Sequence, residues 1–155
     1  MGDSVSRAAV QAFYEALASR DPVRLAQCLA DDVEWYMPGP VDLFPHCGYR
    51  RGKAAVADYI GRLVPSIFSI KRFELEEIVI DGDTVAMLNN ITSVQKDTGR
   101  ILTYQTALFV VFHDGKVVST KGVADTFDIA EQVVGHRIDV YRQPDLPVSK
   151  DVVAL

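Results

Sequence analysis

Apolar and polar residues alternate through most of the chain after about residue 70, and three short turns interrupt this alternation. The turns are Asp81-Gly82-Asp83, Lys96-Asp97-Thr98-Gly99 and Asp114-Gly115. A period of two is typical of β-strands, and short glycine-containing turns join antiparallel neighbours. We therefore expect an antiparallel meander of four strands, Ile70–Ile80, Thr84–Gln95, Ile101–Phe112 and Lys116–Ala124. These strands are longer than the usual ~5–6 residues, so the sheet should curve strongly.

The part of the chain before residue 70 has the period of amphipathic helices. Ser4 or Ser6 can cap a first helix, and Asp21, followed by proline, can cap a second. Asp125 can cap a short last helix that closes at Gly135. The expected helices cover about 5–19, 22–32, 53–68 and 126–134, with a brief strand over 33–37. Helices first and a meander afterwards predict an α+β fold, in which three N-terminal helices lie across the concave side of the sheet and enclose a cavity.

The segment Glu34–Lys53 joins the helical part to the strands and has an unusual composition. It holds the only tryptophan, Trp35, together with His46, Cys47 and Tyr49. Its three prolines and three glycines indicate a shaped loop rather than a regular helix or strand. We expect this loop to form the rim and part of the wall of a small-molecule cavity.

Length and composition restrict the class of protein. The 155 residues fit a single domain, 1–155, with a core over about 5–135 and a C-terminal extension over 136–155. The net charge of −5 argues against a nucleic-acid binder. No apolar run has the length of a membrane span and no signal peptide is recognisable, so a cytoplasmic location is expected. The first residues fit the loose myristoylation pattern at Gly2, or simply a disordered start before a helix cap.

Cofactor and metal motifs are missing from the sequence. Two cysteines, Cys28 and Cys47, are too few for a disulfide framework and are expected to be reduced thiols. Three scattered histidines without spaced acidic partners predict no metal site. No glycine-rich phosphate loop occurs, so no cofactor is implied.

The order of these elements and several motifs resemble the nuclear-transport-factor-2-like superfamily, in particular its SnoaL-like polyketide cyclase and ketosteroid isomerase branch. The motifs are V-Q-A-F-Y-E-A-L, A-D-D-V-E-W, W-Y-M-P-G, G-Y-R-R-G-K-A-A-V and H-D-G-K-V-V. The resemblance covers about residues 5–135. It implies a cone-shaped α+β barrel and a homodimer that forms through the outer face of the sheet. Because the fold hosts enzymes and binding modules alike, it does not decide the function.

The catalytic positions of the family are not filled by catalytic residues in this chain. The carboxylate base of ketosteroid isomerases falls on Met37, and their oxyanion-hole donors fall on Phe13 and Leu108, none of which can exchange a proton or donate a hydrogen bond. The Arg-x-Asp motif of the related epoxide hydrolases falls near Gln105 and Ala107, and their further aspartate near Gly122. Neither mechanism is expected.

His46 and Asp125 remain as candidates for acid/base catalysis. His46 titrates near neutral pH and lies in the loop of the expected cavity, although an exposed loop histidine is the simpler interpretation. Asp125 is fully explained by a capping role unless its side chain turns toward the cavity. Arg50, Arg51 and Lys53 precede a helix and could bind an anion there, or form a solvated rim.

The remaining candidates are expected to line a cavity for a small hydrophobic ligand. They are Phe13, Tyr14, Trp35, Met37, Tyr49, Tyr59, Leu63, Asn90, Thr92, Tyr104, Thr106 and Leu108. If the protein is an enzyme, we expect cofactor-independent proton transfer of the isomerase, cyclase or lyase type on a cyclic or polyketide-like substrate, with Tyr14, Asn90 or Tyr104 as donors to an oxyanion. The alternative is a non-catalytic ligand-binding, accessory or dimerisation domain of the same fold.

Overall fold

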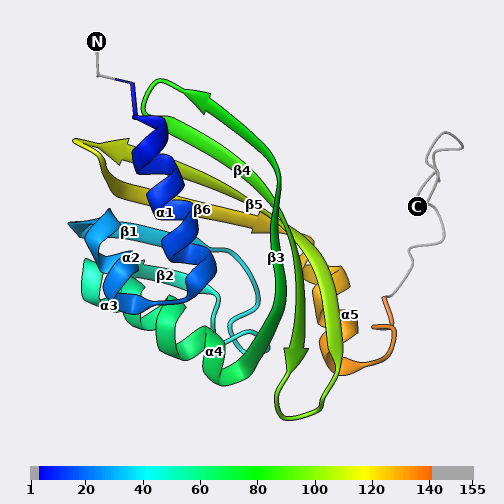
Figure 1. Ribbon diagram of the computed structural model, residues 1–155. Helices are drawn as coiled ribbons and strands as arrows, with labels where there is room; N and C mark the ends of the chain where they lie inside the picture. The colour runs from blue at the N-terminus through cyan, green and yellow to red at the C-terminus, as the bar shows by residue number, and fades with distance from the viewer. Residues whose placement is uncertain (1–3, 141–155) are drawn as a thin grey trace, which may run out of the picture.

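The computed structural model describes residues 4–140, and it consists of one curved sheet with helices packed on its concave side (Figure 1). The sheet has six strands in the order β2-β1-β6-β5-β4-β3. The strands are β1 (Leu29–Met37), β2 (Gly48–Arg51), β3 (Phe68–Asp81), β4 (Thr84–Gln95), β5 (Ile101–His113) and β6 (Lys116–Ala124). The expected α+β fold is confirmed. The expectations for Gly2 and for most of the C-terminal extension fall on residues 1–3 and 141–155, outside the described part.

The four-strand meander is confirmed, but the sheet as a whole is mixed. Strands β3 to β6 pair antiparallel in sequence order. Strand β1 then pairs parallel with β6, with Trp35 opposite Thr120, so the antiparallel pairing expected for the sheet does not extend to this one junction. The long chain between β1 and β6 allows this pairing, because parallel neighbours need a crossover and cannot be joined by a tight turn.

Strand β2 was not expected from the sequence. It pairs antiparallel with β1 inside the segment that we interpreted as a loop, with Tyr36 opposite Tyr49. The strand has four residues and no apolar alternation, so it lacks the signal by which strands are recognised. It also shows that only residues 38–47 form the loop proper.

The sheet curves around three helices and does not close. The helices α1 (Arg7–Ser19), α2 (Pro22–Cys28) and α3 (Lys53–Asp58) lie on its concave side (Figure 1). Register shifts in the β3–β4 ladder mark two irregularities, between Ile70 and Arg72 and between Leu75 and Glu77. Such bulges bend a strand and increase its twist, which accounts for part of the curvature. The short helix α5 (Thr126–Val134) packs at the end of the sheet.

The helix caps follow the sequence closely. The Ser6 hydroxyl accepts a hydrogen bond from Ala9 N at 3.1 Å, and Asp21 Oδ1 accepts from Val23 N at 2.8 Å. Gly135 ends α5 at φ 79°, a left-handed conformation that glycine adopts without strain. Helix α2 ends at Cys28, earlier than the expected Asp31-Asp32, because the chain turns directly into β1 at Leu29.

The third expected helix is divided by a π-helical turn. Helix α3 continues into η1 (Tyr59–Leu63), a π-helix in which Val64 N donates to Tyr59 O, and then into α4 (Val64–Ile67). Pro65 has no amide hydrogen and so cannot continue an α-helical ladder at this point. A Cβ on Gly61 would lie 2.7 Å from the Pro22 ring, so the glycine permits η1 to pack closely on α2.

Candidate functional site

A cavity of about 90 Å³ lies between the concave side of the sheet, the helices and the loop 38–47. Most of its lining is apolar and includes Trp35, Met37, Phe44, Phe68, Phe73 and Leu108. The polar side chains that reach it include Arg20, His46, Tyr59, Asn89, Tyr104 and Thr106. No aspartate or glutamate of the described residues lines it. A proton acceptor in this cavity must therefore be a neutral group.

His46 lies in the wall of the cavity between two aromatic rings. The centroid of its imidazole is 5.6 Å from that of Phe44 and 5.3 Å from that of Phe68, the latter in a T-shaped arrangement. Burial, with a smaller contribution from the positive charge of Arg50, lowers the pKa of His46 to about 4. Its Nδ1 atom is buried without a hydrogen-bond partner among the described residues. The imidazole is therefore neutral at pH 7, and one of its nitrogens has no hydrogen-bond partner among the described residues.

Arg50 holds the loop that carries His46. One guanidinium nitrogen, Nη1, donates to His46 O at 3.1 Å and to Cys47 O at 3.3 Å, and Nη2 donates to Pro45 O at 3.2 Å. The guanidinium carbon also lies 4.0 Å from the centre of the Tyr59 ring. Arg50 thus supports the loop and is not available as the anion-binding group considered above. Lys53 of the same cluster forms an ion pair with Asp31.

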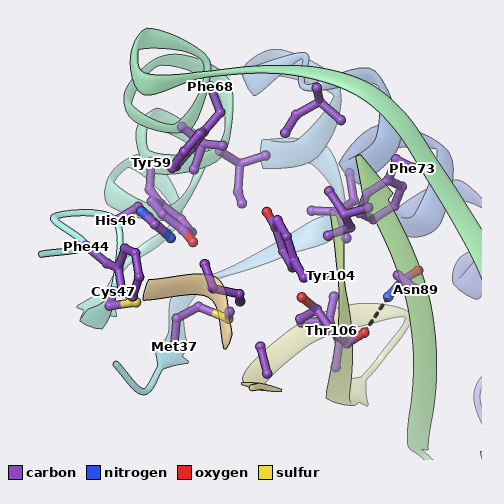
Figure 2. Close-up of a pocket in the computed structure, with 18 of the residues that line it drawn as sticks. Met37, Phe44, His46, Cys47, Tyr59, Phe68, Phe73, Asn89, Tyr104 and Thr106 are labelled. Atoms are coloured by element: carbon purple, nitrogen blue, oxygen red, sulfur yellow. Dashed lines mark hydrogen bonds between the residues drawn. The ribbon is translucent and has the colours of Figure 1, made fainter. Parts of the chain in front are cut away.

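Two tyrosine hydroxyls point toward each other across the cavity, with the His46 ring beside Tyr59 (Figure 2). Tyr59 comes from η1 and Tyr104 from β5, and both line the cavity. Burial raises the pKa of both phenols. This shift is opposed mainly by the positive charge of Arg50 at Tyr59 and by that of Arg20 at Tyr104. Both hydroxyls are therefore protonated at neutral pH, so they can donate hydrogen bonds to an oxygen of a ligand.

Arg20 contributes the only positive charge among the described residues of the lining, and the sequence did not point to it. It follows α1 with φ 58°, and its guanidinium carbon lies 4.7 Å from the centre of the Phe73 ring. Burial is the main cause that lowers its pKa, and the charges acting on it come from Tyr104, Tyr59 and Tyr14. A single arginine between a helix and an Asp-Pro cap has no sequence pattern that distinguishes it from an exposed residue.

The register of β4 and β5 brings Asn89, rather than Asn90, into the cavity. Asn89 is opposite Thr106 and is fully buried, and its Nδ2 donates to Thr106 O at 3.4 Å (Figure 2). Asn90 instead donates to Glu76 Oε2 at 2.8 Å, and the Thr92 hydroxyl lies 3.5 Å from that of Thr103. The expectation that Asn90 and Thr92 lie on the concave face is therefore wrong. Successive side chains of a strand point to opposite faces of the sheet, so an error of one residue places them on the outer face.

Of the candidates named from the sequence, seven line the cavity and seven do not. Those in the lining are Trp35, Met37, His46, Tyr59, Tyr104, Thr106 and Leu108. Asp125 is exposed, and its Oδ1 accepts from Phe127 N and Asp128 N, so the structure assigns it the capping role. Phe13 is buried behind the wall, 5.9 Å from Phe112 between ring centroids.

The other misplaced candidates lie on separate surfaces. Tyr14 stacks on Phe73 at 5.6 Å and lines a groove between α1 and β3. Tyr49 is 57% exposed, since it lies on the outward side of β2. Leu63 packs against the core outside the cavity. The lining residues that the sequence did not indicate include Arg20, Phe44, Phe68, Phe73 and Asn89.

The positions that carry catalytic residues in the related enzymes hold no such residue in this structure. Met37 and Leu108 line the cavity without offering a proton. Gly122 of β6 is buried next to Met37, where a Cβ would overlap the Met37 sulfur. Gln105 is exposed and its amide nitrogen donates to Glu76 Oε2 at 2.7 Å, so it points away from the cavity. The isomerase and epoxide hydrolase positions that face the cavity thus carry no carboxylate, and Gln105 points away from it.

Within residues 4–140, no cluster of three histidine, cysteine or acidic side chains could hold a metal ion. None of the described helices has the length and apolar character of a membrane span.

Comparison with known proteins places the fold. The family model of the SnoaL-like domain matches residues 10–120. A proposed isomerase of Rhodopseudomonas palustris has a similar structure, with 30% identity, a TM-score of 0.76, and coverage of 83% of this chain and 97% of its own. A nuclear-transport-factor-2-like protein of Burkholderia xenovorans shares 28% identity over 81% of this chain and 92% of its own, with a TM-score of 0.69.

A more distant structure shows the same fold only. The protein TerC, crystallised with polyporic acid, is 22% identical, with a TM-score of 0.71 and coverage of 81% of this chain and 95% of its own. No curated protein matches the chain.

Proposed function

Because the chain belongs to the SnoaL-like domain family, we propose that its cavity binds a small, mainly apolar molecule through an oxygen atom and that His46 exchanges a proton with it. The observation that carries this proposal is the convergence of one neutral imidazole and two phenol groups on one apolar cavity. The 30% identical relative described as a proposed isomerase supports the same class of reaction.

The chemistry follows from the protonation states. The free nitrogen of neutral His46 accepts a proton from the carbon next to a ligand carbonyl, and the electron pair of that C–H bond moves into the carbonyl to form an enolate. The Tyr59 and Tyr104 hydroxyls donate hydrogen bonds to the enolate oxygen, where charge develops. If the ligand carries a C=C bond beyond that carbon, the enolate is a dienolate, and return of the proton from imidazolium to its far end shifts the double bond and completes an isomerisation. The low pKa of His46 makes it a weak base and a strong conjugate acid, so the second transfer is the easier one.

The size of the cavity limits the ligand. A cavity of about 150 Å³ lined by apolar side chains holds one benzene ring, and the volume here is about 90 Å³. A single-ring compound fits only if a flexible wall residue such as Met37 moves, which methionine does readily. We therefore propose a one-ring substrate rather than a multi-ring polyketide.

A non-catalytic binding module is the second candidate. The absence of a carboxylate from the described lining, with Met37 in the position of the family base, favours it. The two functions share the ligand and differ only in turnover.

Proton exchange distinguishes them. The probe is cyclohexanone in D₂O, whose α-protons are followed by NMR with and without protein. Exchange that accelerates with wild-type protein, falls at least ~10-fold in His46→Gln and is unchanged in His113→Gln supports catalysis, because His113 is exposed at a turn. Saturable binding without exchange would establish the binding module. Absence of both would refute the binding of a simple cyclic ketone and proton exchange with it.

We also propose that the outer face of the sheet pairs with a second copy of the chain. Phe109 is 48% exposed and Val123 46% exposed, and Ala107 lies directly opposite Val123 in the β5–β6 register. Leu88 is opposite Ala107 on the other side, so these residues form one continuous apolar patch across three strands. Exposed contiguous apolar surface of this kind is typical of interfaces.

A further inference from the structure

We infer that the ligand of this cavity is a monocarboxylate whose charged end lies against Arg20. The inference rests on the proposed function, since it assigns the chemical class of the molecule that the same cavity binds. Three observations carry it, namely the missing partner of Arg20, the backbone conformation at that residue and the donor groups around it.

Arg20 has no ion pair and no side-chain hydrogen bond among residues 4–140, and its Nε atom is buried without a partner. The other described arginines either have a partner or, like Arg7, Arg51 and Arg137, are exposed to solvent. Those with ion pairs are Arg24, Arg62 and Arg72, and those that donate to backbone carbonyls are Arg50 and Arg100. The Phe73 ring at 4.7 Å attracts the guanidinium but cannot accept its N–H groups in the plane. A largely buried cation without an anionic partner is costly, and a ligand anion removes that cost.

The backbone of Arg20 has a left-handed conformation that is unfavourable for a residue with a long side chain. Arg20 is the C-cap of α1 at φ 58°, and its N–H donates to Leu17 O at 3.3 Å. Glycine or asparagine adopts this left-handed conformation with little strain, whereas a long side chain does so at a cost. Arginine is therefore not needed to end the helix. We attribute its presence to a separate role of the side chain in the cavity.

The donors nearest to Arg20 set the character of its end of the cavity, while the unpartnered atoms His46 Nδ1 and Asn89 Oδ1 of the lining are available to another group of the ligand. The Trp35 indole Nε1 is a second buried donor without a partner, and the Tyr59 and Tyr104 hydroxyls also reach the cavity. Such a set fits a ligand group that only accepts, and a carboxylate offers two oxygens with about four lone-pair sites. The single cation balances one negative charge, while a phosphate dianion would leave one unpaired. The remaining walls are apolar and suit a compact hydrocarbon body.

The test compares charged and neutral probes of equal shape. Benzoate and nitrobenzene form one pair, and cyclohexanecarboxylate and cyclohexanecarboxamide form another. Binding to the whole protein is followed at pH 7 through the indole N–H resonance of Trp35, which is the only tryptophan and lies in the cavity wall. The variants are Arg20→Gln, which keeps the length of the stem without the charge, and Arg20→Lys, which keeps the charge. Arg24→Gln, with an exposed ion pair to Glu15, is the matched control.

We expect each carboxylate to bind wild-type protein and Arg24→Gln at least ~10-fold more tightly than its neutral counterpart. Arg20→Gln should lose this preference while it still binds the neutral probes, and Arg20→Lys should keep part of it. Equal affinity of the charged and neutral probes in wild-type protein would overturn the carboxylate and leave the proposed cavity function intact. No binding of either class would overturn both. Because the wild-type comparison decides by itself, the inference stays falsifiable if Arg20→Gln does not fold.

Discussion

The sulfur atom of Met37 lies where the side chain of any larger residue at position 122 would have to be. A Cβ built on Gly122 would overlap Met37 Sδ and would lie 3.3 Å from a methyl carbon of Leu108. The Met37 side chain of β1 thus occupies the space that a side chain at position 122 of β6 would need, and glycine at 122 leaves that space free.

Gly122→Ala should therefore destabilise the protein by about 1–3 kcal/mol through overpacking. Met37→Ala alone removes buried thioether and enlarges the cavity. In the double variant the added methyl group occupies part of the vacated space, so the two changes should be less than additive. Urea unfolding of the four proteins measures the coupling. Additive effects would show that the two side-chain positions do not compete for space.

Lowering the pH should destabilise the fold through His46. Its pKa is about 4 in the folded state and ~6.5 when unfolded, so the unfolded chain binds the proton more readily between these values. The contribution of His46 to the free energy of unfolding should be fully present above pH 6.5 and should decrease as the pH falls toward 4. From pH 7 to 4.5 the loss from this group is about 2 kcal/mol. His46→Gln should remove that part of the pH dependence, whatever its effect at pH 7. Titration of the His46 ring proton near pH 6.5 in the folded protein would contradict this.

Arg50→Lys should loosen the loop that carries His46. Lysine keeps the positive charge but cannot donate to three carbonyls and lie flat on Tyr59 at the same time. We expect a loss of about 1–3 kcal/mol in stability and faster amide hydrogen exchange at residues 45–47. Arg51→Lys, at an exposed neighbour, is the control and should change neither quantity.

Asp125→Ala should affect stability and leave the cavity unchanged. The substitution removes the acceptor for two amide groups of α5, which costs about 0.5–2 kcal/mol at an N-cap. Ligand affinity measured on the folded protein should equal that of wild type. A large loss of affinity or turnover at unchanged stability would restore Asp125 as a catalytic candidate.

Phe109→Glu should convert a dimer to a monomer if the outer face is the interface. The substitution removes the exposed ring, and association would have to take the new charge out of water, which is unfavourable. Light scattering coupled to gel filtration should give twice the mass of one chain for wild type and the mass of one chain for the variant. Asp97→Asn, at an exposed residue in the turn between β4 and β5 and away from the patch, is the control. A monomeric wild type would refute the proposed interface.

The sequence predicted the fold well because its strongest signals are local. Caps at Ser6, Asp21 and Asp125 satisfy nearby amide groups, and glycine turns join neighbouring strands, so both can be recognised within a few residues. Strand β2 and the parallel pairing of β1 with β6 depend on contacts between distant segments, which no local pattern encodes.

The site was predicted less well because it depends on which of two adjacent strand residues faces the cavity and on single residues outside any pattern. In β4 two asparagines are adjacent, and only the larger apolar residues Val85, Met87 and Ile91 identify the buried face. That signal was present and would have selected Asn89. Arg20 had no such signal, since its role arises from the left-handed turn that directs it under Phe73.

The π-helical turn η1 determines how two aromatic residues of the cavity wall are oriented relative to each other around the helix axis. Tyr59, at its start, and Phe68, just after α4, both face the same cavity. Each residue of an α-helix advances by about 100°, so removal of one residue between them would rotate one wall relative to the other by roughly that angle. Such a chain could keep its core at only one end of the helix. An insertion or deletion at residues 60–63 should therefore remove one of the two rings from the cavity, whereas one in the 96–99 turn should leave both in place. The length of the segment 60–63 thus identifies relatives that share the cavity and not merely the fold.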